Sequence, residues 1–376
     1  MLGAMEPTPK LRHGWTTGAC ATAAAKAAYA DLLTGTFPDP VEIRLPGGQS
    51  AAFALAEWDR AESHASAGVI KDAGDDPDVT HGALVRAKIT PGAAGTGIIF
   101  RAGPGVGMVT RPGLAIPPGE PAINPVPRQM IRAALEELAA LHGVACDVVV
   151  EISVQDGEIL AQRTLNGRLG IVGGLSILGT TGIVVPFSCS AWIHSIHRGI
   201  DVARASGITH LAGATGNNSE NAVRALHHMP ETALIEMGDF VGGMLKYLKS
   251  HPVPRVTIAG GVAKMTKLAQ GRLDLHSKRG EVDLPVLAGL AAQIGCNADI
   301  AARIAQANTT AEAFELAQSA GAALGDAIAA QAWQTAAPLL EGCQTELEIV
   351  LFDRTGNLVG RAPFAPVGPH ARNRLV

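Results

Sequence analysis

The sequence predicts two domains, a mixed-sheet α+β domain over residues 1–187 and a parallel α/β domain over residues 188–376. The length of 376 residues fits two domains at roughly 100–200 residues each. Strand patterns dominate the first half, whereas strands alternate with helices in the second half, which is typical of parallel βαβ units. A composition that is 47% hydrophobic and 17% charged is sufficient for two packed cores.

Composition also excludes several classes of protein. The net charge of −4 offers no support for nucleic-acid binding. The sequence contains no run of about 18 apolar residues, so no membrane span is predicted. The N-terminal segment Met1–Gly14 lacks the apolar core of a signal peptide. The five cysteines form no C-x-x-C pair, which is typical of reduced thiols. We therefore expect a cytoplasmic protein that binds neither nucleic acid nor a membrane.

Two helices and several strands are predicted in the first half. The Ala-rich stretch Ala19–Leu33 follows two candidate N-cap residues, Thr16 and Thr17. A second helix begins after Asn124-Pro125, repeats apolar residues at spacings of three and four, and ends at Gly143. Short runs bounded by Gly or Pro are predicted as strands: Val41–Leu45, the alternation around Phe53 and Leu55, Leu84–Ile89 and Ile98–Phe100.

Asp156-Gly157 is the strongest hairpin signal in the chain. The runs Val148–Val154 and Ile159–Leu165 flank this dipeptide, and Asp-Gly is favoured in tight two-residue turns. We therefore expect these two runs to form an antiparallel hairpin.

Strands and helices alternate in the second half. The predicted helices are Ala191–Ala205, Ser219–His228, a helix that ends at Lys249, and helical stretches within Leu284–Ala336. The predicted strands are Ile208–Ala212, Ala233–Met237 and Val256–Ala259. A terminal hairpin is expected around Asp353–Asn357, between Glu346–Phe352 and Leu358–Arg361, and its domain is left open.

The segment Gly213–Asn218 is a candidate ligand site because it directly follows a predicted parallel strand. Ligands of open parallel sheets bind outside the carboxyl ends of the strands. The free N–H groups that begin the following helix suit an anion or a carboxylate. The next strand ends near Glu236, about 20 residues beyond Gly216, where nucleotide folds place an acid on ribose hydroxyls. No complete G-x-G-x-x-G is present, so short βα turns are the alternative.

Two loops of the first half are further candidates. Lys71–Gly82 carries four aspartates and His81, and Asp72 or His81 could transfer protons, whereas a solvated turn is the alternative. The glycine-rich Ala102–Gly113 could cradle a phosphate but lacks the Gly-Lys-Ser/Thr of a P-loop. Arg101 and Arg111 beside it suit carboxylates, unless they are solvated surface residues. We predict no metal site, since His194 and His197 share a helix face without further ligands.

Four segments together resemble the CbiD family, the cobalt-precorrin-5B C1-methyltransferases of cobalamin biosynthesis. They are Leu11–Cys20, Lys71–Gly82, Ala102–Gly113 and Gly213–Glu220. The resemblance runs in order from Leu11 to about Asp283, and the Ala-rich region beyond matches only in character.

The resemblance implies methyl transfer from S-adenosyl-L-methionine to carbon 1 of cobalt-precorrin-5B, an anaerobic-type cobalt-corrinoid, giving cobalt-precorrin-6A. It also implies a Rossmann-like C-terminal domain and cobalt carried by the substrate. As partners we expect the small-molecule corrinoid and transient contact with neighbouring pathway enzymes. Joining it to the strand-end argument, we place the cofactor at Gly213, Thr215, Gly216, Asn217, Glu236 and Asp239. We assign substrate binding to Thr16, Thr17, Lys71, Arg101 and Arg111, and proton transfer to Asp72 and His81.

The chemistry of methyl transfer agrees with the lack of nucleophile and metal-binding motifs in the sequence. A sulfonium methyl and an electron-rich ring carbon need alignment and exclusion of water, not a protein nucleophile or a resident metal. Two alternatives remain: a non-catalytic tetrapyrrole carrier, and a small-molecule kinase that uses Gly103–Gly107. Binding of S-adenosylmethionine, of ATP with magnesium, or of neither would separate the three hypotheses.

Overall fold

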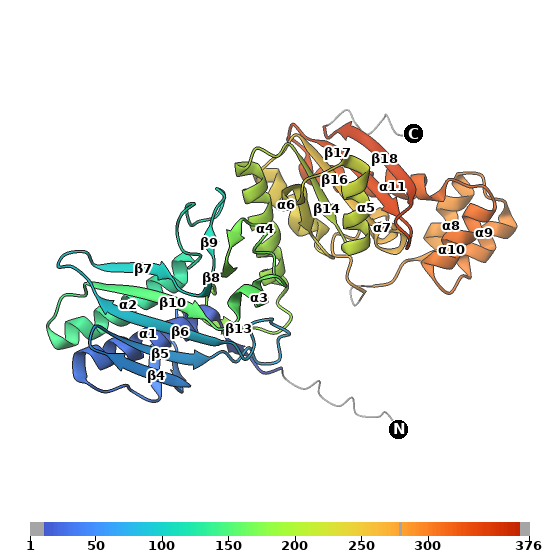
Figure 1. Ribbon diagram of the computed structural model, residues 1–376. Coiled ribbons are helices and arrows are strands. Elements are labelled where there is room, and N and C mark those ends of the chain that lie inside the picture. The colour runs from blue at the N-terminus through green and yellow to red at the C-terminus, as the bar shows by residue number, and fades with distance from the viewer. Residues whose placement is uncertain (1–10, 278–279, 369–376) are drawn as a thin grey trace, which may run out of the picture. The chain divides into compact units, whose positions relative to one another are not determined.

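The computed structural model describes residues 11–277 and 280–368. Met1–Lys10, which carry most of the segment from which we expect no signal peptide, lie outside the described residues. The chain divides between Ser188 and Cys189 into two compact units, each with its own five-stranded sheet (Figure 1). In the described part of the chain, no helix is long and apolar enough to cross a membrane.

The sheet of the first unit is mixed, in the order β4-β5-β6-β10-β7. All neighbouring strands are antiparallel except β10 and β7, which are parallel. Helix α2 lies between β7 and β10 in sequence and supplies the crossover that a parallel pair requires. The bounds are β4 (Glu57–Ala61), β5 (His64–Ile70), β6 (Leu84–Pro91), β10 (Val148–Val154), β7 (Ile98–Ala102) and α2 (Pro125–His142).

Helix α1 (Thr17–Thr34) packs on β5, β6 and α2 and is buried along most of its length. Its many alanines have no side chain beyond Cβ, so the helix can lie close to the sheet. Thr16 is the N-cap, and its hydroxyl accepts a hydrogen bond from the amide of Ala19 at 3.1 Å. The predicted helix is thus confirmed, and of the two candidate caps Thr16 is the one used.

Short strand pairs complete the first unit. Their bounds are β1 (Gly14–Trp15) with β13 (Ile183–Val184), β2 (Val41–Arg44) with β3 (Ser50–Phe53), β9 (Met108–Val109) with β11 (Ile171–Val172), and β8 (Gly105–Val106) with β12 (Gly174–Leu175). Around β8 the backbones approach very closely. A Cβ added to Gly157 or to Gly174 would stand only 2.2 or 2.3 Å from the carbonyl oxygen of Gly105.

The predicted hairpin at Asp156-Gly157 is wrong. Val148–Val154 is strand β10, but Gly157–Ala161 forms the short helix α3. The reason is that β10 already has β6 on one edge and β7 on the other, so no edge is free for a following strand. Gly157 instead lies against Gly105, and this contact directs the chain away from the sheet.

The second unit contains the sheet β15-β14-β16-β17-β18. The first four strands are parallel, and β18 is antiparallel to β17. The terminal hairpin is therefore confirmed and completes this sheet. The bounds are β14 (His210–Ala214), β15 (Leu234–Glu236), β16 (Arg255–Gly261), β17 (Glu346–Phe352) and β18 (Leu358–Pro366).

Helices cover both faces of this sheet. One face of the sheet packs against α4, α6, α7 and α11. On the opposite face, the alternate side chains of the strands pack against α5. Helices α8, α9 and α10 pack on one another beside α11 and α7. The bounds are α4 (Cys189–Ala205), α5 (Asn217–His227), α6 (Val241–Ser250), α7 (Val262–Ala269), α8 (Leu284–Gln293), α9 (Ala298–Ala305), α10 (Thr310–Ser319) and α11 (Leu324–Ala336), with 3-10 turns at Glu231–Ala233 and Ala337–Leu340.

The glycine contact at β8 predicts a stability difference between two Gly→Ala variants. Gly105 and Gly95 both have left-handed φ angles, 78° and 81°, so alanine costs about 1–2 kcal/mol of backbone strain at either. At Gly105 the new Cβ would also stand 2.0 Å from the Val154 carbonyl oxygen, whereas at Gly95 it meets nothing within 4 Å. In urea unfolding we expect Gly105→Ala to lose about 1–3 kcal/mol more than Gly95→Ala. Equal losses would show that the close approach is not rigid.

Candidate functional site

The N-terminal motif, Leu11–Cys20, and the acidic loop, Lys71–Gly82, lie directly against each other in the first unit. The amide of Trp15 donates to the carbonyl of Asp72 at 2.7 Å, and the amide of Asp75 donates to the carbonyl of Arg12 at 2.9 Å. A Cβ on Gly14 would stand 2.0 Å from the Ala73 backbone, so only glycine permits this approach. Two motifs that are about 60 positions apart in the sequence therefore form one structure.

The carboxylate of Asp72, which is partly exposed where the two motifs meet, is held in its ionised form. This carboxylate accepts from the guanidinium of Arg12 through both oxygens and from the amide of Gly74 at 2.9 Å. The hydrogen bond from Arg12, followed by that from Gly74, lowers the pKa of Asp72 to about 2. Because a general base works best with a pKa near the operating pH, Asp72 is a weak proton acceptor.

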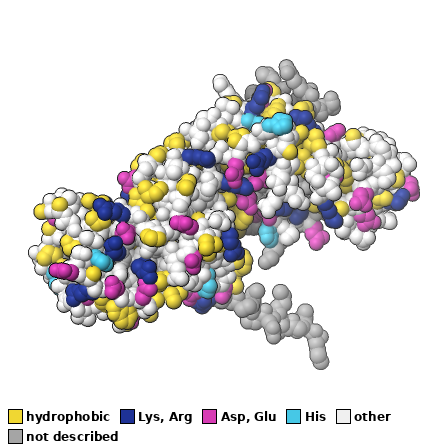
Figure 2. All heavy atoms as spheres, in the orientation of Figure 1, with side chains coloured by type: hydrophobic (Ala, Val, Ile, Leu, Met, Phe, Trp, Pro, Cys, Tyr) yellow, Lys and Arg dark blue, Asp and Glu magenta, His cyan; other side chains and the backbone are white. Residues whose placement is uncertain are grey.

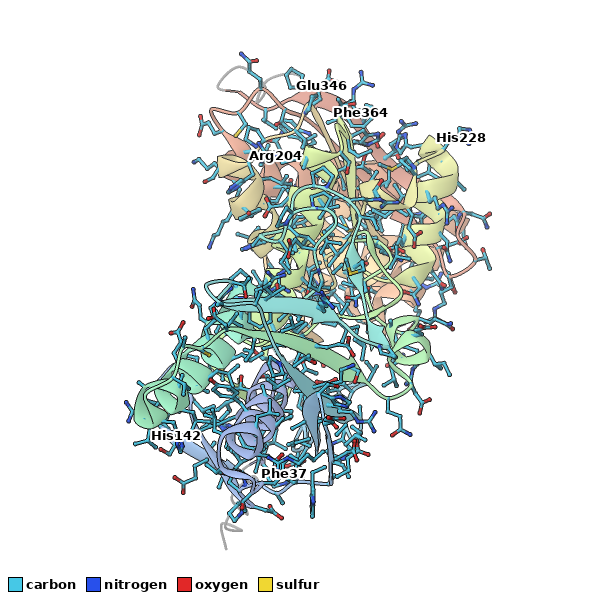
Figure 3. All side chains as sticks on the ribbon, turned by 60° about the vertical axis from the view of Figure 1, so that its left-hand side comes forward. Phe37, His142, Arg204, His228, Glu346 and Phe364 are labelled. Carbon is cyan, nitrogen blue, oxygen red and sulfur yellow. The ribbon has the colours of Figure 1, made fainter. Side chains whose placement is uncertain are left out.

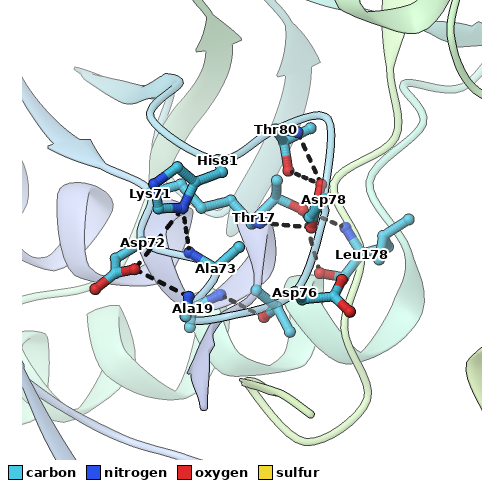
Figure 4. Close-up of polar contacts among 12 residues, drawn as sticks. Thr17, Ala19, Lys71, Asp72, Ala73, Asp76, Asp78, Thr80, His81 and Leu178 are labelled. Carbon is cyan, nitrogen blue, oxygen red and sulfur yellow. Dashed lines mark hydrogen bonds and ion pairs between the residues drawn. The ribbon is translucent and has the colours of Figure 1, made fainter. Parts of the chain in front are cut away.

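His81 presents a hydrogen-bond donor to solvent. Its Nδ1 accepts from the backbone amide of Ala73 at 3.1 Å (Figure 4). In the neutral ring the proton therefore resides on Nε2. The side chain is 53% exposed, so the ring is accessible from solvent. In this tautomer His81 can donate a hydrogen bond from Nε2.

Lys71 and Asp78 form a buried ion pair beneath the loop (Figure 4). The Lys71 side chain is only 1% exposed, and its ammonium donates to Asp78 at 2.6 Å. Thr80 donates to the other oxygen of Asp78 through its amide and its hydroxyl, at 2.8 and 2.6 Å. Burial opposes ionisation of Asp78, but Lys71 and Thr80 outweigh it and lower the pKa of this carboxyl. The Lys71 ammonium is therefore committed to an internal partner.

The two Thr-Thr-Gly sequences of the chain lie together. The amide of Thr16 donates to the carbonyl of Gly182 at 3.0 Å. The Thr17 hydroxyl donates to the carbonyl of Leu178 at 3.2 Å and accepts from its amide at 3.0 Å (Figure 4). With the Thr16 hydroxyl used as a helix cap, both threonine side chains hold the backbone of the site in place.

Arg101 and Arg111 lie elsewhere in the first unit. Arg101 is exposed on β7, where its neighbour Phe100 faces the core. Arg111 donates to the carbonyl of Arg168 at 3.4 Å, and its stem packs beside Gly170. Within residues 11–277 and 280–368, neither arginine makes a hydrogen bond or ion pair with the acidic loop.

The glycines of Gly103–Gly107 are explained by packing. A Cβ added to Gly103 or to Gly107 would stand within 3.1 Å of backbone oxygens of Ile152 or Gly174, and Gly105 is tighter still. This segment therefore uses its glycines for contact between strands. That removes the main reason for expecting a phosphate cradle here.

A cleft of about 700 Å³ lies in the second unit at the carboxyl ends of β14, β16 and β17. Its lining comprises Thr215–Ser219, Gly261–Lys264, Phe352–Thr355 and Val359, with Phe314 and other residues of α10. The chain leaves β14 toward β15 on one side, while β16 lies on the other side. Such a reversal of strand order is where open α/β sheets bind ligands.

Lys264 is one of the charged side chains that line this cleft, and it is not among the predicted site residues. Its ammonium donates to the carbonyl of Thr215 at 2.8 Å and lies 3.1 Å from a carboxylate oxygen of Asp239. The only sequence signal was the pair Gly260-Gly261 at the preceding strand end. Cβ atoms added to Gly216 or Gly261 would meet nothing within 4 Å, so the backbone there borders open space.

The six residues assigned to the cofactor separate into two groups. Thr215, Gly216 and Asn217 line the cleft. Gly213, Glu236 and Asp239 do not belong to its lining. A Cβ on Gly213 would stand 2.4 Å from the sulfur of Met244, so this glycine faces the core. Glu236 ends the neighbouring strand β15, and Asp239 reaches the cleft only through Lys264.

The turn Asp353–Asn357 is a second feature that the sequence analysis assigned only to structure. Asp353 accepts from the amides of Thr355 and Asn357, both at 2.8 Å, which fixes the turn. Asp353, Arg354 and Thr355 then form part of the cleft wall. On the face shown in Figure 2, basic and acidic side chains are interspersed and do not form one patch of a single sign.

Comparison with known proteins gives a consistent result. The family model described as CbiD matches residues 4–186, and the model described as CbiD, C-terminal domain, matches residues 274–363. A cobalt-precorrin-5B C(1)-methyltransferase of Agrobacterium fabrum is 64% identical, covering 95% of this chain and 94% of the relative. That of Halorhodospira halophila is 61% identical, covering 94% and 95%. A crystal structure of the cobalamin biosynthesis protein CbiD from Archaeoglobus fulgidus is 28% identical, with a TM-score of 0.40, covering 72% of this chain and 83% of that one.

The buried pair predicts how the first unit responds to a lost charge. Lys71→Met leaves the carboxylate of Asp78 in a largely buried place without its ammonium, and we expect a loss of about 3 kcal/mol in urea unfolding at pH 7. Lys88→Met is the matched control, because Lys88 and Glu151 are 3.4 Å apart and both partly exposed to solvent, and it should lose less than about 1 kcal/mol.

The penalty of Lys71→Met should also depend on pH. The pKa of Asp78 is lowered in the folded protein, so its stabilisation is complete above the ordinary value of 3.8 and disappears as the pH falls through the lower folded value. The difference between wild type and Lys71→Met should therefore shrink below pH 3.8. A difference that stays constant into this range would contradict the ion-pair explanation.

Proposed function

Because the chain belongs to the CbiD family, we propose that it methylates carbon 1 of cobalt-precorrin-5B, giving cobalt-precorrin-6A in cobalamin biosynthesis. One observation carries the proposal: relatives 64% and 61% identical over nearly their whole length bear this activity in their names. The protein is accordingly a C-methyltransferase, and cobalt enters its reaction as part of the substrate.

The methyl donor in this proposal is S-adenosylmethionine, bound in the cleft of the second unit. The strand order β15-β14-β16-β17-β18 corresponds to 2-1-3-4-5 in chain order, which supports a Rossmann-like doubly wound sheet. A volume of about 700 Å³ is within the range of small-molecule sites. The N-terminus of α5 offers N–H groups for the carboxylate of the donor, and Gly216 and Gly261 leave room for its nucleoside.

The residues of the chain mainly have to bind and align. S-adenosylmethionine supplies an electrophilic methyl group, and the tetrapyrrole supplies an electron-rich carbon, so no protein nucleophile is needed. Positioning two reactants in a near-attack geometry can account for about 7–11 kcal/mol of a barrier. In the cleft, Lys264 fixes the backbone of Thr215 while Asp239 holds Lys264, so this pair positions the segment that carries Gly216 and Asn217.

We keep the acidic loop as part of the proposed substrate site, but we assign different roles to Asp72 and His81. Asp72 has a pKa of about 2 and is paired with Arg12, so it orients Arg12 and does not remove a proton. His81 presents Nε2–H and is suited to donate to a carboxylate side chain of the macrocycle. Arg101 and Arg111 remain proposed partners of such carboxylates. Lys71, Thr16 and Thr17 act indirectly, because their polar groups are bound within the protein.

The proposed setting is the cytoplasm, with a small cobalt-corrinoid as partner and transient contacts to neighbouring pathway enzymes. The scattered cysteines, none of which is paired, suit a reducing compartment. Of the alternative functions, the kinase loses its support at Gly103–Gly107, where the glycines serve packing. A carrier without catalysis would bind the corrinoid but not S-adenosylmethionine.

The cofactor cleft can be tested by filling it. Gly261→Val places a side chain into open space at the cleft, so the protein should fold while S-adenosylhomocysteine binds at least about tenfold more weakly, or ~1.4 kcal/mol, by calorimetry. Gly289→Val on α8 is the control, because a Cβ there also meets nothing within 4 Å and Gly289 does not line the cleft. Unchanged affinity in Gly261→Val would move the cofactor out of this cleft.

A second variant measures how far the cofactor site extends. If the ribose reaches the end of β15, Glu236→Ala removes a hydrogen bond to a charged acceptor and weakens binding by about 1.5–3 kcal/mol. Wild-type affinity in folded Glu236→Ala, together with a loss in Gly261→Val, would confine the site to the ends of β14, β16 and β17.

The reaction itself is tested with methyl-labelled S-adenosylmethionine and the cobalt intermediate. We expect the label at ring carbon 1, because this position is named in the closely related proteins, and NMR of the product locates it. A label at another ring carbon would contradict the position but keep the class of reaction. No transfer to any corrinoid by folded protein with bound cofactor would contradict the function.

A further inference from the structure

We propose that His210, His227 and Glu348 form a binding site for a divalent transition-metal ion of the zinc class, on the sheet face that α5 covers. The three residues come from β14, the last position of α5, and β17. One ligand atom of each lies within 4.8 Å of the others. The site uses none of the residues of the cofactor cleft, so it is independent of the proposed reaction.

The strand register explains why these side chains meet. Thr257 on β16 pairs with Glu348 on β17 and with Ala212 on β14, and Ala212 is two residues from His210. Because side chains alternate along a strand, His210, Thr257 and Glu348 all project toward α5. They form a row across three neighbouring strands. His227 completes the group from above, at the C-terminal end of α5.

Hydrogen bonds already gather the ligand atoms around one carboxylate oxygen. The Oε2 atom of Glu348 lies 2.6 Å from Nε2 of His227 and accepts from the Thr257 hydroxyl at 2.8 Å. The Nε2 atom of His210 lies 2.8 Å from the same hydroxyl. The Nε2 atom of His227 therefore faces the oxygen that would bind the ion, and the Nε2 atom of His210 faces the Thr257 hydroxyl that donates to this oxygen.

Glu348 is fully buried, and its second oxygen is held apart from the histidines. Oε1 accepts from Arg361 through Nε at 2.8 Å and lies 2.6 Å from Nη2. A charged group of this kind behind a ligating carboxylate fixes its orientation, as partners of metal ligands commonly do. The arrangement leaves Oε2 as the available donor atom. Phe364, labelled beside Glu346 in Figure 3, packs near the two histidine rings with centroids 5.2 and 5.8 Å away, which adds apolar surroundings.

Two imidazole nitrogens and one carboxylate oxygen are the donor set of many zinc sites. Three protein ligands leave a fourth position for water or for the Thr257 hydroxyl. Zinc binds such atoms at about 2.0–2.2 Å, so binding would separate His227 from Glu348 slightly and draw His210 inward. Each ring would then carry its proton on Nδ1, and the Nε2 hydrogen bonds would be replaced by bonds to the ion. The competing explanation is a polar network that satisfies Glu348 without any ion.

The position of the group indicates a structural role. His210 begins β14, and the cleft begins after the opposite end of this strand, roughly 13 Å away at 3.3 Å per residue. Helix α5 connects the two places, because Asn217 at its start lines the cleft and His227 ends it. An ion at His227 would fix the far end of the helix whose beginning frames the cofactor cleft.

The test uses the full-length chain without an affinity tag, stripped of metal by a chelator. Zinc is titrated by calorimetry, and cobalt(II) is added separately to follow its visible ligand-field absorption. We expect one saturable site, a cobalt spectrum of low coordination number, and a zinc-dependent rise in Tm. His227→Gln keeps a side-chain donor for Glu348 but is a poor metal ligand, so the folded variant should bind zinc at least about tenfold more weakly.

His194→Gln is the matched control, because His194 belongs to the other close pair of histidines, with ring centroids of His194 and His197 6.2 Å apart. It should bind zinc like wild type. The proposal is overturned if wild type shows no saturable binding, or if His227→Gln binds zinc as well as wild type does. It is also overturned if His194→Gln loses the same affinity, since binding would then be at the histidine pair of α4.

Discussion

The first unit depends on close contact between backbone segments, which is possible only where no Cβ intervenes. Gly14 and Gly74 let the N-terminal motif lie on the acidic loop, and Gly105, Gly157 and Gly174 let three chain segments meet at one point. In the second unit, Gly325 of α11 and Gly360 of β18 make a similar contact. Several glycines that look like ligand-binding residues in the sequence are therefore packing residues. Their effect on function is indirect, because they bring the loops that carry Asp72 and His81 into place.

The acidic loop shows how its internal bonds limit the chemistry of its side chains. Lys71 and Asp78 neutralise each other inside the protein, and Arg12 neutralises Asp72 at the surface. The exposed His81 ring offers its Nε2–H group as a hydrogen-bond donor. Exposed donors such as Arg12 and His81 are suited to binding a ring that carries carboxylates. Asp72, whose pKa is lowered to about 2 by Arg12 and Gly74, is less suited to proton abstraction.

Sheet topology organises the second unit in the same way. Parallel strands bring their carboxyl ends to one edge, and the reversal between β15 and β16 around β14 opens the cleft there. The same alignment of strands places His210, Thr257 and Glu348 in one row nearer the opposite edge. Helix α5 therefore has a proposed ligand site at each end, one formed by backbone groups and glycines and the other by the side chains of His210, His227 and Glu348. The helix is the element through which the two would influence each other.

The sequence by itself determined the elements with strong local signals: the α1 helix with its threonine cap, the helix between Pro125 and Gly143, the alternating second half and the terminal hairpin. These depend on capping, periodicity and turn residues, which act over a few positions. Tertiary structure decided the rest. It turned Asp156-Gly157 into the start of a helix, because both edges of β10 are occupied, and it made β5 an interior strand although most of its residues are small. It also brought together His227 and Glu348, 121 positions apart, and committed Lys71 to Asp78. Pairing and burial of this kind depend on contacts between distant segments, which no local pattern records.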